Sequence, residues 1–377
     1  MQMPPKRIVM NALSYKQDSS GIGVMIRELF FRLAALSPQE CAAVLSKDSP
    51  VLPRNLSLQE IRSPYNHSQG LRRMLFQTVI FGRQYCRDAL LLTTDSKTPF
   101  FLPSSCRLVP LVTDLAVYRM GNVYKLSRTL WWKLQYRYVR RKAVHYIAIS
   151  AFTKGEMVKI LGIAPEKIDI VPCACDPAYV RVTEEAHLAA LRRKYGLSNR
   201  VILFVGNNNP RKNLSRTIQA FDAVRRASSA PLQLVIAGEQ GWKFDRAQAL
   251  AGIEFADDVR FLGFVPDADM PALYSAASVF AFPTLYEGFG IPVLEAQQCG
   301  VPVLTSNTSS LPEVGGNGAL YVNPKSVEEI AQGMCSLLEN DTFSQQLVAR
   351  GYENAQRFSW ERSAEKLNEI VERVMQK

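Results

Sequence analysis

Residues 278–300 read SVFAFPTLYEGFGIPVLEAQQCG. The apolar run at the start predicts a buried strand, and the later proline predicts a helix that starts near Gly290 and Ile291. Glu287 would then lie in the loop before the helix, and Glu295 about one and a half turns inside it. Because carboxylates are strong acceptors for paired hydroxyls, we expect the two acids to reach different parts of one ligand. The simpler alternative is an acidic helix start without a ligand.

The rest of the chain repeats this order of strand, turn and helix. At 377 residues it exceeds one typical domain, and about 150 residues per domain suggests two. Alternating β-branched runs and helical-period segments predict parallel sheets of an α/β fold. The predicted strands are residues 7–11, 89–93, 108–113, 146–150, 201–206, 232–238, 259–263, 278–283 and 301–306. We predict two doubly wound, Rossmann-like domains, 1–180 and 181–377, that face each other across a cleft.

The turn after the strand at 201–206 has the composition of an anion site. It reads GNNNPRKN, residues 206–213, and leads into a predicted helix with Arg211 and Lys212 at its start. Helix-start amides and two cations would together neutralise a diphosphate. A solvated turn with ordinary surface cations is an equally open alternative.

A second glycine turn lies near the amino terminus. The stretch DSSGIGVMIREL covers residues 18–29, and Gly21 and Gly23 would let the backbone approach a ligand just before a helix. A lone Gly-x-Gly is weak support, because glycines also mark loops that bind nothing.

Together these stretches resemble a known family. Residues 286–306, YEGFGIPVLEAQQCGVPVLTS, and 309–324, SSLPEVGGNGALYVNP, resemble the nucleotide-sugar-binding half of the retaining glycosyltransferases of family GT4, which have the GT-B fold. Residues 201–214 resemble the phosphate-binding strand and turn of the family, and the chain as a whole resembles its mannosyltransferase-type members. The resemblance covers nearly the whole chain and is more specific in the second domain.

The resemblance implies roles for the donor-site residues. Arg211 and Lys212 would bind the diphosphate, Glu287 the sugar hydroxyls and Glu295 the ribose. Further donor contacts are implied at Gly21, Gly23, Gly206, Phe264, Gly288, Phe289, Gly290 and Ile291. The last helix, about 358–377, would pack back toward the first domain.

The implied reaction is transfer of a hexose from a nucleoside diphosphate with its anomeric configuration retained. Overall likeness favours mannose or rhamnose on GDP as the donor. The acceptor would be a glycan or lipid-diphosphate-linked glycan in the synthesis of a surface polysaccharide such as a lipopolysaccharide O-antigen. Such enzymes need no protein nucleophile, because cations and amides stabilise the leaving group.

Two departures from the family pattern concern the first domain. Many members have His-Asp after the fourth strand, whereas Thr113 and Asp114 stand here, near the acceptor or sugar. The missing histidine leaves one donor-sugar contact and the donor identity open. The usual turn Val-Pro-Asn-Gly is replaced by VPCA at 171–174.

We expect neither a cofactor nor a metal. Asp267-Ala268-Asp269 spells an Asp-x-Asp motif, but it precedes a predicted helix, so we interpret Asp267 as a helix cap. The seven cysteines are scattered and odd in number, which argues against a disulfide framework and favours the cytoplasm.

The excess of positive charge lies in the first half of the chain. Residues 1–190 hold 26 Lys and Arg against 14 Asp and Glu, and the segment 119–142 holds eight basic residues and no acid. This segment could lie on an anionic membrane surface at the cytoplasmic face, or it could be a core-packed helix with a basic outer face. Nucleic acid is disfavoured, because no nucleic-acid motif accompanies the charge.

Two alternative functions stay open. Sugar epimerases and phosphorylases share the GT-B fold. A catalytically weak member that only binds nucleotide sugar or glycan is the other alternative, for which Thr113 is the best support.

Overall fold

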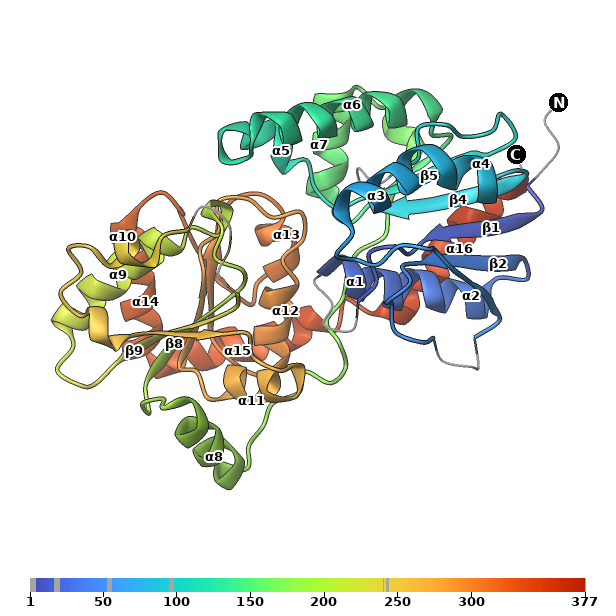
Figure 1. The fold of residues 1–377 in the computed structure, drawn as a ribbon. Coiled ribbons are helices and arrows are strands. Elements are labelled where there is room, and N and C mark those ends of the chain that lie inside the picture. Colours follow the sequence, from blue (N-terminus) through green and yellow to red (C-terminus); the bar gives the residue numbers. More distant parts are fainter. Residues whose placement is uncertain are drawn as a thin grey trace. The chain divides into compact units, whose positions relative to one another are not determined.

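The computed structural model describes residues 5–16, 21–52, 56–94, 98–239, 241 and 244–376. The chain divides into two compact units (Figure 1). Unit 1 comprises Met1–Cys173 with Ser359–Lys377, and unit 2 comprises Ala174–Phe358. The chain therefore crosses from unit 1 to unit 2 at Cys173 and Ala174, and it returns to unit 1 at Ser359.

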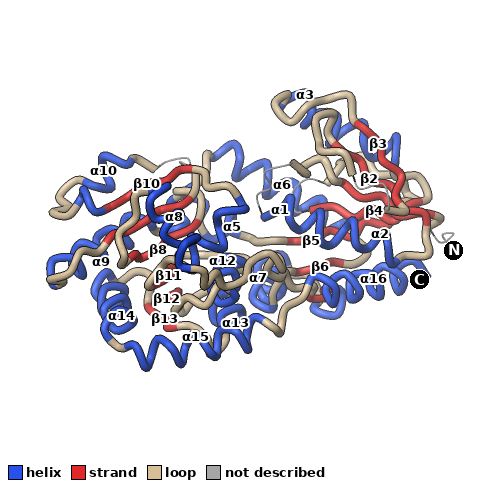
Figure 2. The backbone as a smooth tube through the Cα atoms, turned by 90° about the horizontal axis from the view of Figure 1, so that it is seen from below, coloured by secondary structure: helices blue, strands red, loops and turns tan. Residues whose placement is uncertain are grey.

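Unit 1 is built on one parallel sheet of seven strands within its described residues. The strand order is β3-β2-β1-β4-β5-β6-β7. The strands are β1 (Arg7–Asn11), β2 (Glu40–Leu45), β3 (Leu58–Arg62), β4 (Ala89–Thr94), β5 (Arg107–Val112), β6 (Tyr146–Ala148) and β7 (Ile168–Ile170). The central strands β4 and β5 are apolar and buried along their length, as expected where helices cover both faces of a parallel sheet (Figure 2).

The helices of unit 1 form two layers, one on each face of this sheet. They are α1 (Gly21–Met25), α2 (Arg32–Leu36), α3 (Gly70–Leu75), α4 (Phe81–Tyr85), α5 (Ala116–Arg119), α6 (Leu126–Lys142), α7 (Ala151–Leu161) and α16 (Trp360–Gln376). The π-helical turns Ile26–Phe31 and Phe76–Ile80 join α1 to α2 and α3 to α4, and 3-10 turns span Gly121–Val123 and Pro165–Lys167. The π-helical turn Phe76–Ile80 and the helices α4, α6 and α7 share one core, which includes Phe76, Phe81, Tyr136 and Met157.

Helix α16 completes unit 1 after the chain has formed unit 2. Its buried side includes Trp360, Leu367 and Val371, which recur at helical spacing. Arg107 Nη1 donates to the carbonyl of Val374 at 2.6 Å, and so satisfies the end of the helix. Ser363 Oγ donates to the carbonyl of Pro172 at 2.8 Å, at the point where the chain leaves unit 1.

Unit 2 has a parallel sheet of six strands in its described part, in the order β10-β9-β8-β11-β12-β13. The strands are β8 (Val201–Val205), β9 (Gln233–Ala237), β10 (Val259–Gly263), β11 (Val279–Phe282), β12 (Val303–Ser306) and β13 (Leu320–Val322). The order reverses between β8 and β11, which pair directly. This reversal is the topological switch point of a Rossmann-like sheet, where the loops after two strands diverge and leave room for a ligand.

Helices cover both faces of the unit 2 sheet. They are α8 (Glu185–Tyr195), α9 (Leu214–Ala227), α10 (Arg246–Leu250), α11 (Met270–Ser275), α12 (Ile291–Gln298), α13 (Leu311–Gly315), α14 (Val327–Glu339) and α15 (Asp341–Ala355). Single 3-10 turns span Pro210–Lys212, Ala256–Asp258 and Asp267–Asp269. The core on one face is formed by α9, α14 and the strands between them, with Phe204, Ile218 and Met334 among its members.

The predicted strands all occur, with ends shifted by a few residues, but four strands were missed. These are β2, β3, β7 and β13. The outermost strand β3 reads LQEIR and is partly exposed, so it lacks an apolar run. Strands β7 and β13 span only three residues each. Among the described residues, no helix is both long enough and apolar enough to cross a bilayer.

Candidate active site

The loops after β8 and β11 are tied together at the switch point of unit 2. Leu285 N donates to the carbonyl of Arg211 at 2.9 Å. Asn213, at a positive φ of 64°, donates through Nδ2 to the carbonyls of Pro283 at 2.8 Å and Pro324 at 2.6 Å. This side chain therefore clamps the loop after β8 against the loops after β11 and β13.

Within these loops, Arg211, Lys212 and Glu287 form one ion-paired cluster. Arg211 Nη1 lies 2.9 Å from Glu287 Oε2, and Lys212 Nζ lies 3.0 Å from Glu287 Oε1. Glu287 and Lys212 are 6% and 9% exposed. The structure thus brings together the three residues predicted to act on the diphosphate and sugar. The two cations share a single carboxylate, so the cluster carries one net positive charge.

Burial and ion pairing shift the pKa values of Glu287 and Lys212 in opposite directions. Burial by itself raises the pKa of Glu287, but Arg211 and Lys212 outweigh it and hold that pKa below its usual value. Burial lowers the pKa of Lys212, although Glu287 partly offsets this effect. Glu287 therefore stays ionised at neutral pH.

Gly206 lies beside Lys212 in a backbone conformation that favours glycine. Its φ is +143°, and a Cβ at this position would come within 3.4 Å of Lys212 Cε. Asn209 caps the following turn, because its side chain accepts a hydrogen bond from Arg211 N at 3.1 Å. The predicted glycine and asparagine turn is thus the local reason that both cations face the loop after β11.

Glu295 occupies a different environment inside α12. Tyr274 Oη, from α11, donates to Glu295 Oε2 at 2.7 Å. Burial raises the pKa of Glu295 to about 7, while the hydrogen bond from Tyr274 acts in the opposite direction. The two predicted acids therefore differ in kind, since one is held ionised and the other changes its protonation state near neutral pH.

A glycine and a serine fix the conformation of the loop between the two acids. Gly290 precedes α12 with φ of +111°, and a Cβ there would lie 2.7 Å from Leu311 Cδ2. Ser310 Oγ donates to the carbonyls of Glu287 at 3.0 Å and Phe289 at 2.7 Å. The backbone of Gly288 and Ile291 lies in this same loop and helix start, while the side chain of Phe289 is buried against Phe358.

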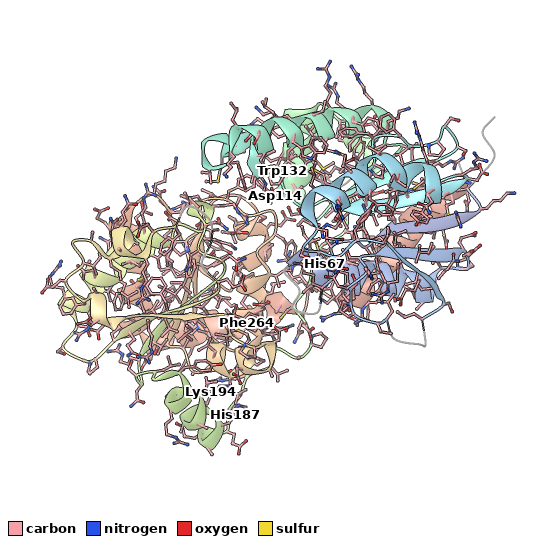
Figure 3. All side chains as sticks on the ribbon, viewed as in Figure 1. His67, Asp114, Trp132, His187, Lys194 and Phe264 are labelled. Carbon is pink, nitrogen blue, oxygen red and sulfur yellow. The ribbon has the colours of Figure 1, made fainter. Side chains whose placement is uncertain are left out.

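Phe264 and the Asp-x-Asp motif lie beyond the end of β10. Phe264 is exposed and stands two strands away from β8 in the sheet (Figure 3). The interpretation of Asp267 as a helix cap is wrong, because residues 267–269 form a 3-10 turn and no side chain caps α11. The carboxylate of Asp269 pairs with Lys194 at 2.5 Å and accepts from Tyr195 Oη. In the described ranges, no group of three His, Cys, Asp or Glu side chains could hold a metal ion.

The remaining predicted residues belong to unit 1. Gly21 and Gly23 lie in α1, whereas residues 18–20 of the same motif lie outside the described residues. Thr113 and Asp114 follow β5. Asp114 Oδ1 accepts from Ala116 N at 2.9 Å, and the carbonyl of Asp114 accepts from Tyr136 Oη at 3.0 Å. Asp114 therefore shapes the turn into α5.

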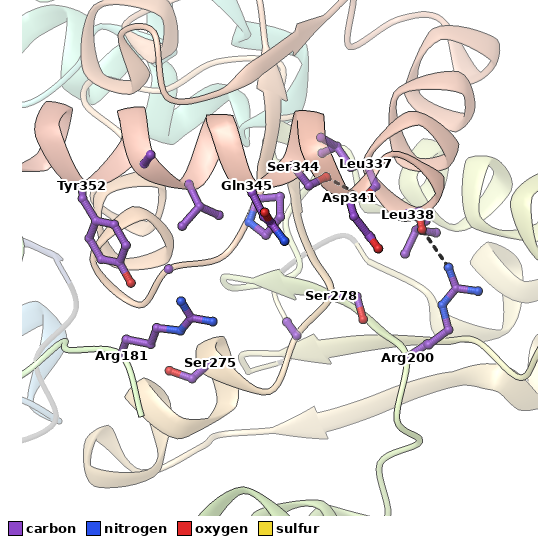
Figure 4. Close-up of a pocket in the computed structure, with 15 residues that line it drawn as sticks. Arg181, Arg200, Ser275, Ser278, Leu337, Leu338, Asp341, Ser344, Gln345 and Tyr352 are labelled. Carbon is purple, nitrogen blue, oxygen red and sulfur yellow. Dashed lines mark hydrogen bonds between the residues drawn. The ribbon is translucent and has the colours of Figure 1, made fainter. Parts of the chain in front are cut away.

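A pocket of about 740 Å³ lies elsewhere in unit 2 (Figure 4). Its lining includes Arg200, Ser278 and Pro302, which precede β8, β11 and β12. The pocket therefore lies at the amino ends of these strands, whereas the cluster of Arg211, Lys212 and Glu287 lies beyond the carboxyl ends. Arg200 Nη2 donates to the carbonyl of Leu338 at 3.0 Å. None of the predicted donor-site residues lines this pocket.

Three residues that support the site were not predicted. Asn213 and Ser310 were within quoted motifs, but only the fold shows that they hydrogen-bond across loops. Tyr274 was part of a predicted helix, and its hydrogen bond to Glu295 depends on how α11 packs beside α12. For Tyr274 the available signal was a polar hydroxyl in an otherwise apolar helix, whereas Asn213 and Ser310 stand in polar stretches that gave no such signal.

Comparison with known proteins gives concordant results. Residues 190–357 match the family described as glycosyl transferases group 1. The chain is 32% identical over 265 residues to the O-antigen chain mannosyltransferase B of Escherichia coli, a match that covers 70% of this chain and 69% of that protein.

Solved structures share the fold of the chain at lower sequence identity. Sucrose-phosphate synthase from Thermosynechococcus elongatus matches with a TM-score of 0.76 and 19% identity, over 98% of this chain and 99% of that one. Anabaena HepE, solved in complex with UDP and glucose, matches with a TM-score of 0.74 and 17% identity over the same shares. At these identities the likeness shows the fold alone.

Proposed function

The chain belongs to the group 1 glycosyl transferases and has the GT-B fold, and on this premise we propose that it moves a hexose from a nucleoside diphosphate sugar to a glycan or lipid-linked glycan acceptor. The observation that carries the proposal is the cluster of Arg211, Lys212 and Glu287 at the switch point of unit 2. One carboxylate shared by two cations leaves positive charge for a diphosphate.

Arg211 and Lys212 stabilise the leaving group in this proposal. As the bond between the sugar and the diphosphate breaks, negative charge grows on the diphosphate oxygens. The two cations act strongly because Lys212 is buried and Glu287 holds both in place before the ligand arrives. The acceptor hydroxyl attacks from the face that the diphosphate leaves, and its proton passes to a departing phosphate oxygen. The anomeric configuration is then retained without a protein nucleophile.

The two acids bind different hydroxyls of the donor. Glu287 orients the cations and accepts from the hexose near the reacting carbon, while the amides of the loop around Gly290 contact phosphate. Glu295 accepts from the ribose hydroxyls, in a position fixed by Tyr274. The separate environments of the two carboxyls support this division. Glu287 lies directly against the two cations, whereas Glu295 is bound by Tyr274, so the two carboxyls would accept different hydroxyls of the donor.

Mannose on GDP is the donor that we propose. The support is the relative in Escherichia coli, an O-antigen chain mannosyltransferase at 32% identity. By the same likeness we place the acceptor in surface polysaccharide synthesis. UDP-glucose is the competing donor, because HepE was solved with UDP and glucose.

A donor panel followed by product analysis tests the proposal. Purified protein is screened for thermal stabilisation by GDP-mannose, GDP-rhamnose, UDP-glucose and the free nucleotides, since a ligand that binds the folded state raises the Tm. The stabilising donor is then incubated with mannose-terminated oligosaccharides, and NMR of the product reports the anomeric configuration. We expect release of GDP and an α-linked product.

Two variants make this test specific. Arg211→Gln should lower kcat by about a hundredfold or more, as for loss of one electrostatic group in other enzymes. Arg193→Gln, an exposed cation on α8, removes the same charge and should have the parent activity. Epimerised donor without a transferred sugar, or turnover that requires inorganic phosphate, would contradict the proposed reaction.

A further inference from the structure

Helix α6 of unit 1 has apolar side chains on both of its sides. Its inner side packs into the core through Tyr136 and Val139. Its outer side carries Leu126, Leu130 and Leu134, which are 74%, 58% and 52% exposed. A spacing of four residues places the three leucines along one line of the helix surface. Figure 1 shows α6 running along the outside of unit 1. This exposed stripe is unusual, because globular proteins rarely leave contiguous leucines in water.

Cations stand between these leucines. Lys133, Arg137 and Arg141 are also four residues apart and exposed. At about 100° per residue they fall within the same third of the helix surface as the leucine stripe. The helix has no acidic residue. Its outer face therefore combines apolar contact area with uncompensated positive charge.

A second segment of unit 1 has the same character. Residues 70–85 form α3, the π-helical turn and α4, and they include no acid. Leu71 and Leu75 are more than half exposed, and Ile80 is exposed beside them in sequence, while Phe76 and Phe81 face the core. Arg72 and Arg83 are exposed on this segment.

Two phenylalanines join this segment to α6. Phe100 N donates to the carbonyl of Thr78 at 2.9 Å. The ring of Phe100 lies edge-on to Trp131, with centroids 5.4 Å apart, and also contacts Tyr138. The exposed Phe101 lies under the guanidinium of Arg83 at 5.1 Å. Phe100 thus links residues 70–85 to α6. We call the exposed side chains of these two segments, together with Phe101, the basic apolar face.

We propose that the basic apolar face docks on an anionic lipid bilayer. Leucines enter the boundary between headgroups and acyl chains, and Lys133, Arg137 and Arg141 extend to the lipid phosphates. Charge complementarity selects this occupant, because a second copy of the chain would bring like charge against like charge. The inference goes beyond the donor chemistry, and its test contains no nucleotide sugar, so it stands or falls separately from the proposed reaction.

Vesicle co-sedimentation of the full chain tests the proposal. The vesicles contain either phosphatidylcholine alone or phosphatidylcholine with phosphatidylglycerol. We expect binding to the anionic vesicles that weakens as salt is added, since surface charge is screened. The triple variant Leu126→Asn, Leu130→Asn, Leu134→Asn should bind about tenfold less or weaker still. The triple variant Lys133→Gln, Arg137→Gln, Arg141→Gln should lose about as much and show a weaker preference for phosphatidylglycerol.

Matched variants control for charge and folding. Arg193→Gln, Lys325→Gln and Lys366→Gln together remove the same charge from exposed positions elsewhere and should leave vesicle binding at the parent level. Unchanged thermal unfolding of all variants shows that the fold is intact. Equal binding of the parent to both vesicle types, or full binding by the leucine variant, would overturn the proposal. Self-association of the parent that the leucine variant abolishes, without vesicle binding, would assign the face to a second copy instead.

Discussion

Tyr274 donates a hydrogen bond of 2.7 Å to Glu295, and it does so from a fully buried position on the neighbouring helix. The partnership matters because burial raises the pKa of Glu295 to about 7. The tyrosine supplies a donor that favours the ionised carboxylate, which is the form that best accepts two ribose hydroxyls.

Donor affinity should therefore depend on pH. The pKa of Glu295 is raised, so the carboxyl is protonated below about pH 7 and ionised above it. We expect the affinity for GDP-mannose to rise from about pH 6 to about pH 8. Isothermal titration calorimetry measures it, and the intact nucleotide sugar is used because a free terminal phosphate would itself titrate.

Tyr274→Phe should shift the pH at which the donor affinity rises. Loss of a donor to the charged carboxylate raises the pKa of Glu295 further. The affinity midpoint should shift to higher pH, with the affinity at high pH nearly restored. Glu295→Gln is the control and should bind weakly at every pH. A uniform loss of affinity in Tyr274→Phe would mean that the tyrosine only supports the fold.

Removal of Glu287 should destabilise unit 2. Glu287→Gln leaves Lys212 without its buried counter-ion, which costs about 3 kcal/mol in other proteins. The pKa of Glu287 is lowered, so its contribution is full at neutral pH and is lost as the pH falls through the carboxyl range. Thermal unfolding at several pH values should show the largest difference from the parent near neutrality.

The diphosphate should compensate for this loss. We expect GDP to raise the Tm of Glu287→Gln more than that of the parent, because the nucleotide replaces the missing negative charge. If GDP raised the Tm of the two proteins equally, the diphosphate would not bind beside Arg211 and Lys212.

Gly290→Ala should disrupt the loop between the two acids. The backbone φ of +111° disfavours any Cβ, and the new methyl group would lie 2.7 Å from Leu311. We expect a loss of about 1–3 kcal/mol in stability together with weaker nucleotide binding. Gly155→Ala in α7 is the matched control, since a Cβ there meets nothing within 4 Å. That substitution should be neutral or slightly stabilising.

Transfer should continue in the presence of a chelator. Arg211 and Lys212 supply the positive charge that a divalent ion supplies in other transferases. We expect kcat in EDTA to stay within about twofold of its value without the chelator. Activity that is lost in EDTA and restored by magnesium would contradict this assignment of the leaving-group charge.

The sequence was sufficient for the elements with a strong local pattern. The runs VILFV and VFAF are apolar and bounded by turn residues, so β8 and β11 were predictable, and with them the loops that carry Arg211 and Glu287. The start of α12 was predictable from the glycine and proline around Ile291. Strand β3 was not, because its five residues include Gln59 and Glu60 and its burial is partial.

Contacts between elements could not be predicted from local pattern. Asp269 is a residue type that often caps helices, and it stands directly before α11. Its carboxylate nevertheless pairs with Lys194, which is 75 residues away. The shared pairing of Arg211 and Lys212 with Glu287 likewise depends on the adjacency of β8 and β11, which only the strand order gives. The exposure of Leu126, Leu130 and Leu134 required knowledge of which side of α6 the core takes.

The place of α16 in unit 1 affects how the chain matures on the ribosome. Residues 1–173 emerge first, but α16, which packs against α2 and the π-helical turn Ile26–Phe31, is made only after all of unit 2 has been translated. Unit 2 is contiguous, so it can reach its native state while unit 1 is still incomplete. The earlier-made half of this protein is therefore the last to be completed, and the apolar surface that α16 covers stays open to water during synthesis.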